Sequence, residues 1–181
     1  ETVTPHAMPF LAEAAGYANI PGILLNVKNL VDDTAGTLGW SDASKYAPLI
    51  VNGVLTAGLL GKLDFLSAGD ALKYGAYWLL ANAAGMYFVP DKAMEGWGAS
   101  YKGPAEFTMV KLMGQSIGFY GMLLYKLSEG ASATEALGYA WALGTAANID
   151  GSYISKFSVF PEDKSRFWLA VGGVGAAALL L

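Results

Sequence analysis

The sequence predicts an all-α fold, a polytopic bundle of helices embedded in a membrane. Charged residues make up 14% of the 181 residues and hydrophobic residues 54%, whereas soluble chains are about 25% charged. The mean hydropathy is +0.39. Uncharged runs of 14 to 17 residues recur along the chain. Two of them, 74–90 and 136–149, lack the charged stripe of helical period that a solvated helix needs.

The uncharged runs predict the main helices, and they are 46–61, 74–90, 112–125, 136–149 and 167–181. Each is shorter than the ~20 apolar residues that span a bilayer. Lysines at the edges can lengthen a run, because their charged ends reach the interface. Trp and Tyr residues near the run ends are typical of the aromatic belt of membrane proteins. A soluble bundle with buried helices is the alternative, since runs of this length would also fit it.

Two similar stretches indicate an internal repeat: GWSDASKYAP at 39–48 and GWGASYKGP at 96–104. Each is followed by an uncharged run and then by Leu-Ser-x-Gly, at 66–69 and 127–130. A Pro-(Glu)-Asp-Lys element follows in both copies. Matches that keep one order predict a duplicated helical hairpin, and the alternative is chance similarity in a chain rich in Gly and Ala. A duplicated two-helix unit returns the chain to its starting side, which makes the repeat parallel.

The repeat divides the chain into two regions. Residues 1–38 form an N-terminal interfacial or amphipathic segment, and residues 39–181 form the membrane helical bundle. Within the bundle we expect two tandem hairpins, 39–95 and 96–166, and then a final apolar helix at 167–181.

The N-terminal segment carries few charges over residues 7–31. We expect Pro21-Gly22 to break it into two short pieces, because proline removes a backbone hydrogen bond and disrupts a helix interior. These pieces would lie in the membrane interface and lead into the first span. The alternative is an amphipathic cap packed on the bundle.

Several residues predict where helices begin and end. Asp70, and either Thr134 or Glu135, are expected as N-terminal caps, where an oxygen acceptor or a negative charge suits the exposed N–H groups. Pro90 and Pro161 fall where helices are expected to stop.

The distribution of basic residues predicts the topology. Eight of the eleven Lys and Arg residues lie before the first bundle helix or in 91–111 and 150–166. The two tight turns carry Lys62, Lys73 and Lys126. By the positive-inside tendency, the amino terminus and the long connections face the cytoplasm-like side.

The sequence carries few groups that suit catalysis. It has no cysteine, and His6 is its single histidine, so neither a thiolate site nor a histidine metal site is expected. Phosphate-loop and dinucleotide fingerprints are absent from the sequence. A net charge of −4 without a basic cluster argues against nucleic-acid binding. We therefore expect no enzymatic activity and no metal centre.

Neutral polar residues lie inside the uncharged runs, namely Asn52, Thr56, Asn82, Gln115, Ser116, Thr145 and Asn148. One interpretation is hydrogen bonding between helices, worth about 0.6 kcal/mol per contact. The other makes Asn52, Asn82 or Gln115 an oxygen ligand of a chlorophyll magnesium, since magnesium prefers oxygen. Chlorophyll and carotenoid are the cofactors considered on this second interpretation.

Small residues recur at helical spacing in Gly114, Gly118 and Gly121, in Ala57 and Gly61, and in Gly172 and Ala176. Such faces let helices approach closely, within the bundle or against a partner.

The connection VPDKAMEGWG at 89–98 and the following MGQSIGFYG at 113–121 resemble a family of small four-helix membrane proteins of bacteria and algal plastids. The resemblance covers residues 40–181. Algal members of this family resemble accessory subunits of photosystem–antenna complexes in thylakoids. The chain departs from light-harvesting proteins, because it lacks their paired helices with Glu and Arg.

The resemblance implies a non-catalytic integral membrane subunit that bridges or stabilises a photosynthetic complex in the chloroplast thylakoid. Its partners would be membrane lipids and photosystem or antenna subunits. The alternative function is a small-molecule or lipid transporter built on the duplicated hairpin, with Asn52, Asn82 and Gln115 lining its midplane. A membrane enzyme is a third possibility.

Overall fold

The computed structural model describes residues 8–37, 39–99, 103–157 and 162–181. Within these ranges it confirms the all-α prediction and contains no strand. The elements are α1 (Met8–Val31), α2 (Thr34–Thr37), α3 (Asp42–Leu59), α4 (Ala68–Phe88), α5 (Pro90–Gly96), α6 (Pro104–Ser128), α7 (Ala133–Ile149), the π-helical turn η1 (Asp150–Ile154) and α8 (Glu162–Leu180).

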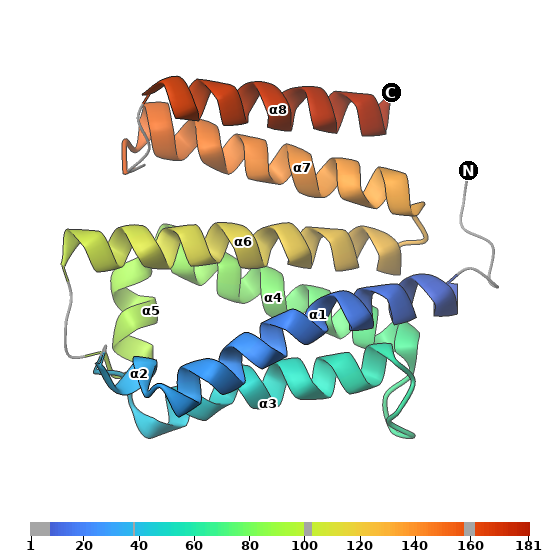
Figure 1. Cartoon of the computed structure of the whole chain (residues 1–181). Helices are drawn as coiled ribbons and strands as arrows, with labels where there is room; N and C mark the ends of the chain where they lie inside the picture. The colour runs from blue at the N-terminus through green and yellow to red at the C-terminus, as the bar shows by residue number, and fades with distance from the viewer. Residues whose placement is uncertain (1–7, 38, 100–102, 158–161) are drawn as a thin grey trace.

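The long helices are stacked in a defined order (Figure 1). Helix α8 packs on α7, α7 on α6 and α6 on α4, while α1 pairs with α3 on the other side of the bundle. The most extensive contact joins α4 to α6, and α4 has a smaller contact with α3, its partner in the first predicted hairpin. Helices α3 and α4 are therefore held together largely through their neighbours, whereas α6 and α7 pack directly on each other.

The prediction that Pro21-Gly22 breaks the N-terminal segment is wrong, because α1 runs without interruption through both residues. Proline in a helix interior costs about 3 kcal/mol. Close packing on α3 offsets that cost: Ala12 and Ala15 are buried in the main core. Asn19, two residues before the proline, donates a hydrogen bond to Thr56 Oγ1 at 2.9 Å.

The prediction that Asp70, and Thr134 or Glu135, are the N-terminal caps is wrong, because Ser67 caps α4 and Ser132 caps α7. Ser67 Oγ accepts from the backbone N–H of Asp70 at 3.1 Å, and Ser132 Oγ accepts from that of Glu135 at 3.1 Å. The acidic residues stand in the first turn, where their charge favours the helix N-terminus. Both helices thus begin with Ser-x-x-acid, at 67–70 and 132–135, while Ser128 of the second Leu-Ser-x-Gly ends α6.

Pro90 stands where it was expected, one residue after the cap of α4 and at the start of α5. Pro161 lies outside the described residues. The equivalence of units 39–95 and 96–166 stays a prediction.

The glycine face of α6 is used inside the chain. Gly114, Gly118 and Gly121 are buried against α4, and a Cβ added to Gly114 would lie 3.0 Å from the backbone oxygen of Ala83. Gly172 and Ala176 of α8 are likewise buried, and a Cβ on Gly172 would lie 2.5 Å from Thr145 Oγ1 of α7. For these two faces the structure shows packing within the bundle. The expected face of Ala57 and Gly61 is wrong, because Gly61 lies beyond the end of α3 in an exposed turn.

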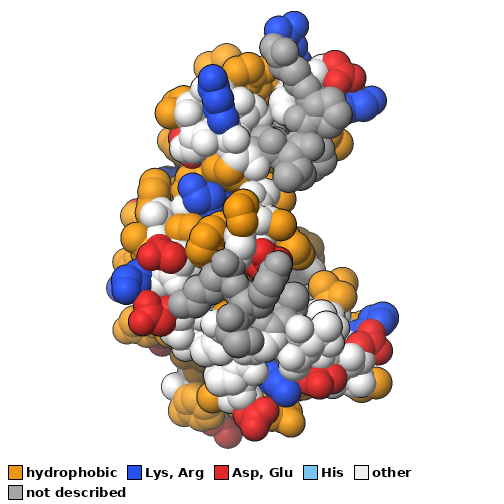
Figure 2. Space-filling view, turned by 90° about the vertical axis from the view of Figure 1, so that its left-hand side faces the viewer, with side chains coloured by type: hydrophobic (Ala, Val, Ile, Leu, Met, Phe, Trp, Pro, Cys, Tyr) orange, Lys and Arg blue, Asp and Glu red, His pale blue; other side chains and the backbone are white. Residues whose placement is uncertain are grey.

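Charged residues gather at the two ends of the bundle and leave a charge-free band between them. In α6 and α7 the uncharged runs 112–125 and 136–149 each hold 14 residues, which corresponds to about 21 Å of helix. The part of run 74–90 that lies in α4, residues 74–88, holds 15 residues, or about 23 Å. One end carries Lys28, Lys45, Lys92, Lys111, Lys156, Lys164 and Arg166. Figure 2 looks onto this end.

Among the described residues, no helix combines enough length with enough apolar character to cross a bilayer.

Candidate functional site

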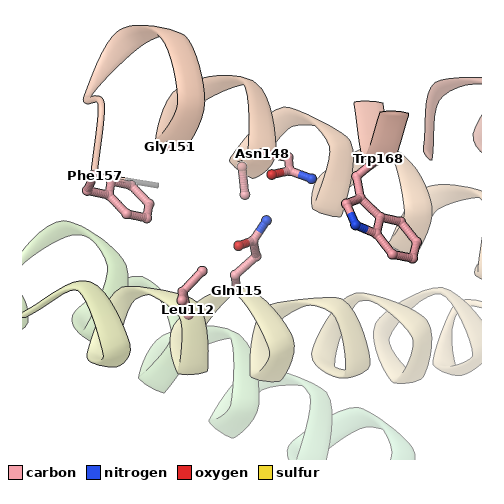
Figure 3. Close-up of a pocket in the computed structure, with 7 residues that line it drawn as sticks. Leu112, Gln115, Asn148, Gly151, Phe157 and Trp168 are labelled. Atoms are coloured by element: carbon pink, nitrogen blue, oxygen red, sulfur yellow. The ribbon is translucent and has the colours of Figure 1, made fainter. Parts of the chain in front are cut away.

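A cavity lies between α6, α7 and α8 (Figure 3). It consists of a hollow of about 320 Å³ and an adjoining hollow of about 200 Å³, which share Gln115, Asn148 and Trp168. We call the two together the α6–α8 hollow. Its lining consists of Leu112, Gln115, Ser116, Phe119, Trp141, Gly144, Thr145, Ala147, Asn148, Gly151, Phe157, Trp168 and Gly172.

The hollow exists because α7 holds both of its neighbours closely while α6 and α8 stay apart. Leu179 and Leu180 of α8 fit against Gly138 of α7. On the other side of α7, Gly144 approaches the ring of Phe119 from α6. Helices α6 and α8 share no extensive contact. In Figure 2 the molecule is visibly hollowed between the α7–α8 lobe and the remainder.

Two primary amides supply the main hydrogen-bonding capacity of the hollow. Gln115 Nε2 donates to the backbone oxygen of Gly144 at 3.2 Å, which joins α6 to α7 and fixes the side chain. The Asn148 side chain has no hydrogen-bond partner among the described residues. Figure 3 shows Gln115 rising from α6 toward α7, where Asn148 lies. The hydroxyls of Ser116 and Thr145 instead donate to their own helices.

Aromatic rings form the walls of the hollow. Phe119 and Trp141 meet edge to face with ring centroids 5.9 Å apart, an arrangement that aromatic quadrupoles favour. Trp168 of α8 and Phe157, after η1, lie on either side of the two amides (Figure 3). The lining of the hollow thus combines flat apolar surfaces with neutral polar groups.

A polar cluster lies beside the lining residues Ala147 and Phe157. Tyr87 of α4 donates from its hydroxyl to Asp150 Oδ2 at 2.7 Å, with the backbone oxygen of Ala147 at 3.0 Å. Lys111 of α6 lies 4.6 Å from the ring centroid of Phe157, within cation–π range. Asp150 begins the π-helical turn η1, and such turns are frequent at functional sites.

The pKa of the Asp150 carboxyl lies below its ordinary value of 3.8, because Tyr87 and then Ser155 donate hydrogen bonds to it. A carboxyl with a lowered folded-state pKa stabilises the fold above its unfolded pKa, and this contribution is lost as the pH falls through the folded value. We therefore expect wild type to lose more stability than Asp150→Asn between pH 6 and pH 3.

Thermal unfolding followed by circular dichroism at both pH values measures this difference. Asp64→Asn is the matched control, because Asp64 lies in an exposed turn and has no hydrogen bond or ion pair among the described residues. This control should respond to pH as wild type does. Equal pH responses of wild type and Asp150→Asn would contradict the role given to this carboxylate.

The three amides predicted as pigment ligands belong to different helix contacts. Gln115 lines the α6–α8 hollow. Asn52 of α3 faces α1, where Asn19 Nδ2 lies 3.5 Å from its Oδ1. Asn82 of α4 donates from Nδ2 to the oxygen of Trp78 in its own helix at 2.8 Å. Their role as pigment ligands stays a prediction, and the geometry brings Asn148 rather than Asn52 or Asn82 into the hollow with Gln115.

The described residues contain no group of three or more side chains suited to hold a metal ion. Comparison of the chain with protein-family models, with curated protein sequences and with solved structures gave no match. Within the described residues, the protein is an all-α bundle. Its candidate site is a hollow with aromatic walls and no charged side chain in the lining.

Proposed function

We propose that this chain is a non-catalytic integral membrane subunit that packs on a larger membrane protein complex. The observation that carries the proposal is the charge-free band, which extends across α3, α4, α6, α7 and α8. Residues 14–27 of α1 are also uncharged. Lysines beside the band can direct their charges to the interface, and a bilayer adapts to short apolar spans at modest cost.

Large apolar side chains on the outside of the band support the same proposal. Leu24, Leu25, Ile50, Val54, Trp78 and Val174 are between 45% and 69% exposed. They come from α1, α3, α4 and α8, so the apolar surface extends around the bundle. Extensive exposed apolar surface is typical of membrane or protein contact. In the proposed complex, lipids and the helices of partner subunits would cover this apolar surface.

The two ends of the bundle carry different numbers of basic residues, which supports one orientation of the chain in the membrane. Seven of the described basic residues lie at the end seen in Figure 2, and Lys62, Lys73 and Lys126 are at the turns of the other end. Under the positive-inside tendency, the first end would face the cytoplasm-like side.

The proposed complex is a photosystem–antenna assembly of the chloroplast thylakoid. This part of the proposal depends on the resemblance of residues 89–98 and 113–121 to algal accessory subunits. The chain would bridge or stabilise the assembly through its apolar helix faces. A transporter is the second candidate function. The feature that favours it is the α6–α8 hollow, and not a path lined by all three predicted amides.

Extraction of native membranes in mild detergent, followed by a density gradient probed for this chain, tests the proposal. We expect the chain to migrate with a heavy chlorophyll-bearing band, and to stay with the membrane during an alkaline carbonate wash. Migration near 19 kDa plus detergent, without pigment, would overturn the subunit role and favour the transporter. Recovery in the soluble fraction would overturn the membrane location itself.

A further inference from the structure

We propose that the α6–α8 hollow binds an uncharged ring molecule of one or two fused rings that bears a keto oxygen. The inference stands on the geometry of the hollow and does not require the subunit role. It assigns Gln115 and Asn148 as the hydrogen-bonding residues and the aromatic walls as the stacking surfaces.

The charge of the ligand follows from the lining. Among the described residues, the lining of both hollows includes no Asp, Glu, Lys, Arg or His. A charged ligand would therefore lose hydration without gaining an opposite charge, which is costly. Lys111 and Asp150 lie near one end, but each already has a neighbour, Phe157 for the lysine and Tyr87 for the carboxylate. An uncharged ligand fits this arrangement best.

The shape of the ligand follows from the walls. Phe119, Trp141 and Trp168 contribute flat surfaces from three different helices. Rings stack and meet edge to face on such surfaces, and these contacts add to the burial of apolar area. The larger hollow, at about 320 Å³, lies at the lower end of the range of small-molecule pockets, roughly 300–1,000 Å³. A ligand of one or two fused rings suits that volume.

The keto oxygen follows from the two amides. Gln115 Nε2 donates one of its two N–H groups to the oxygen of Gly144, so the second N–H is the group left to donate to a ligand oxygen. Asn148 Nδ2 has no acceptor among the described residues, although the side chain is partly buried in the lining. An unpaired amide in an apolar surrounding gains by donating to a ligand oxygen. A keto group is an uncharged acceptor that meets this need.

Menadione, an uncharged naphthoquinone with two keto oxygens, is a suitable probe for the purified full chain in dodecylmaltoside. Quinones quench tryptophan fluorescence, and Trp141 and Trp168 line the hollow. We expect saturable quenching by menadione. We also expect 2-methylnaphthalene, which has the same rings without oxygen, to compete at least tenfold more weakly. Linear, non-saturable quenching would show partition into the micelle and overturn the site.

Variants test the assigned residues. Asn148→Leu removes an amide that supports no hydrogen bond among the described residues, so the fold should persist. We expect it to weaken menadione binding about fivefold, the value of one net hydrogen bond. Gln115→Leu should weaken binding and also lower the melting temperature, because it loses the bond to Gly144.

Asn82→Leu is the matched control, since Asn82 bonds its own helix on α4, outside the hollow. It should bind menadione as wild type does. Equal affinities of wild type and Asn148→Leu, with both proteins folded by circular dichroism, would overturn the assignment of Asn148. Because these measurements use isolated protein, their failure leaves the gradient experiment on the subunit role unaffected.

Discussion

Replacing Gly114 with leucine is expected to force α6 away from α4 and to destabilise the fold by about 3 kcal/mol, the upper part of the range for overpacking. A Cβ at this position would lie 2.9 Å from Met86 Cβ, 3.0 Å from the oxygen of Ala83 and 3.2 Å from the backbone nitrogen of Tyr87. Two of these three atoms belong to the backbone of α4. They cannot rotate away as a side chain could, so the helices themselves must move.

Thermal unfolding in detergent measures the effect of this substitution. A loss of about 3 kcal/mol corresponds to a fall of roughly 6–12 °C in the melting temperature of a chain of this size. Gly85→Leu, on α4, is the matched control because nothing lies within 4 Å of its added Cβ. That control should be neutral or slightly stabilising, since glycine in a helix interior costs about 1 kcal/mol. Equal losses in both variants would contradict the close α4–α6 contact.

Leu124→Ala is expected to cost 2–5 kcal/mol, the range for removing a buried leucine side chain. Leu124 is 0% exposed, and it belongs to the main core cluster with Leu59 of α3 and Leu72 of α4. The cavity left by the substitution would lie inside this main core cluster. The surrounding backbone is already held by the close α4–α6 contact, so it can fill that cavity only in part.

Chemical or thermal unfolding gives the free energy of unfolding of Leu124→Ala and of Leu25→Ala. The comparison distinguishes the effect of removing a buried leucine from that of removing an exposed one. Leu25 of α1 is 58% exposed, so its replacement should cost less than about 1 kcal/mol. A large loss for Leu25→Ala together with a small loss for Leu124→Ala would mean that the core lies elsewhere.

The sequence was sufficient to predict the helical class and the approximate position of each long bundle helix, whereas the short helix α5 lies in a segment interpreted as a connection. The predicted boundaries differ from the structure for a physical reason. Run 74–90 was bounded by charges, whereas α4 begins at Ala68, because Ser67 satisfies an exposed backbone N–H. Helix termini follow hydrogen bonds, and an absence of charge does not locate them. The continuity of α1 through Pro21 could not be predicted, since it depends on packing against α3.

The candidate site could be predicted only in part. Gln115 was singled out because it is a polar residue in an apolar run, and it does line the hollow. Its neighbour there is Asn148, whereas Asn52 and Asn82 lie in other contacts. The pairing of Tyr87 with Asp150 joins residues 63 positions apart. No local spacing could indicate that pairing, because it depends on how α4 and α7 are placed by α6.

The stacking order of the helices makes resistance to unfolding uneven across the bundle. Helix α8 has one extensive neighbour, α7, whereas α6 has two, α4 and α7. Local unfolding of a protein begins most readily at the elements that have the fewest buried contacts. Release of α8 therefore requires less free energy than separation of α4 from α6. Since α8 supplies Trp168 to one wall, we expect an excursion of α8 to open that wall of the hollow while the core around Leu124 stays closed.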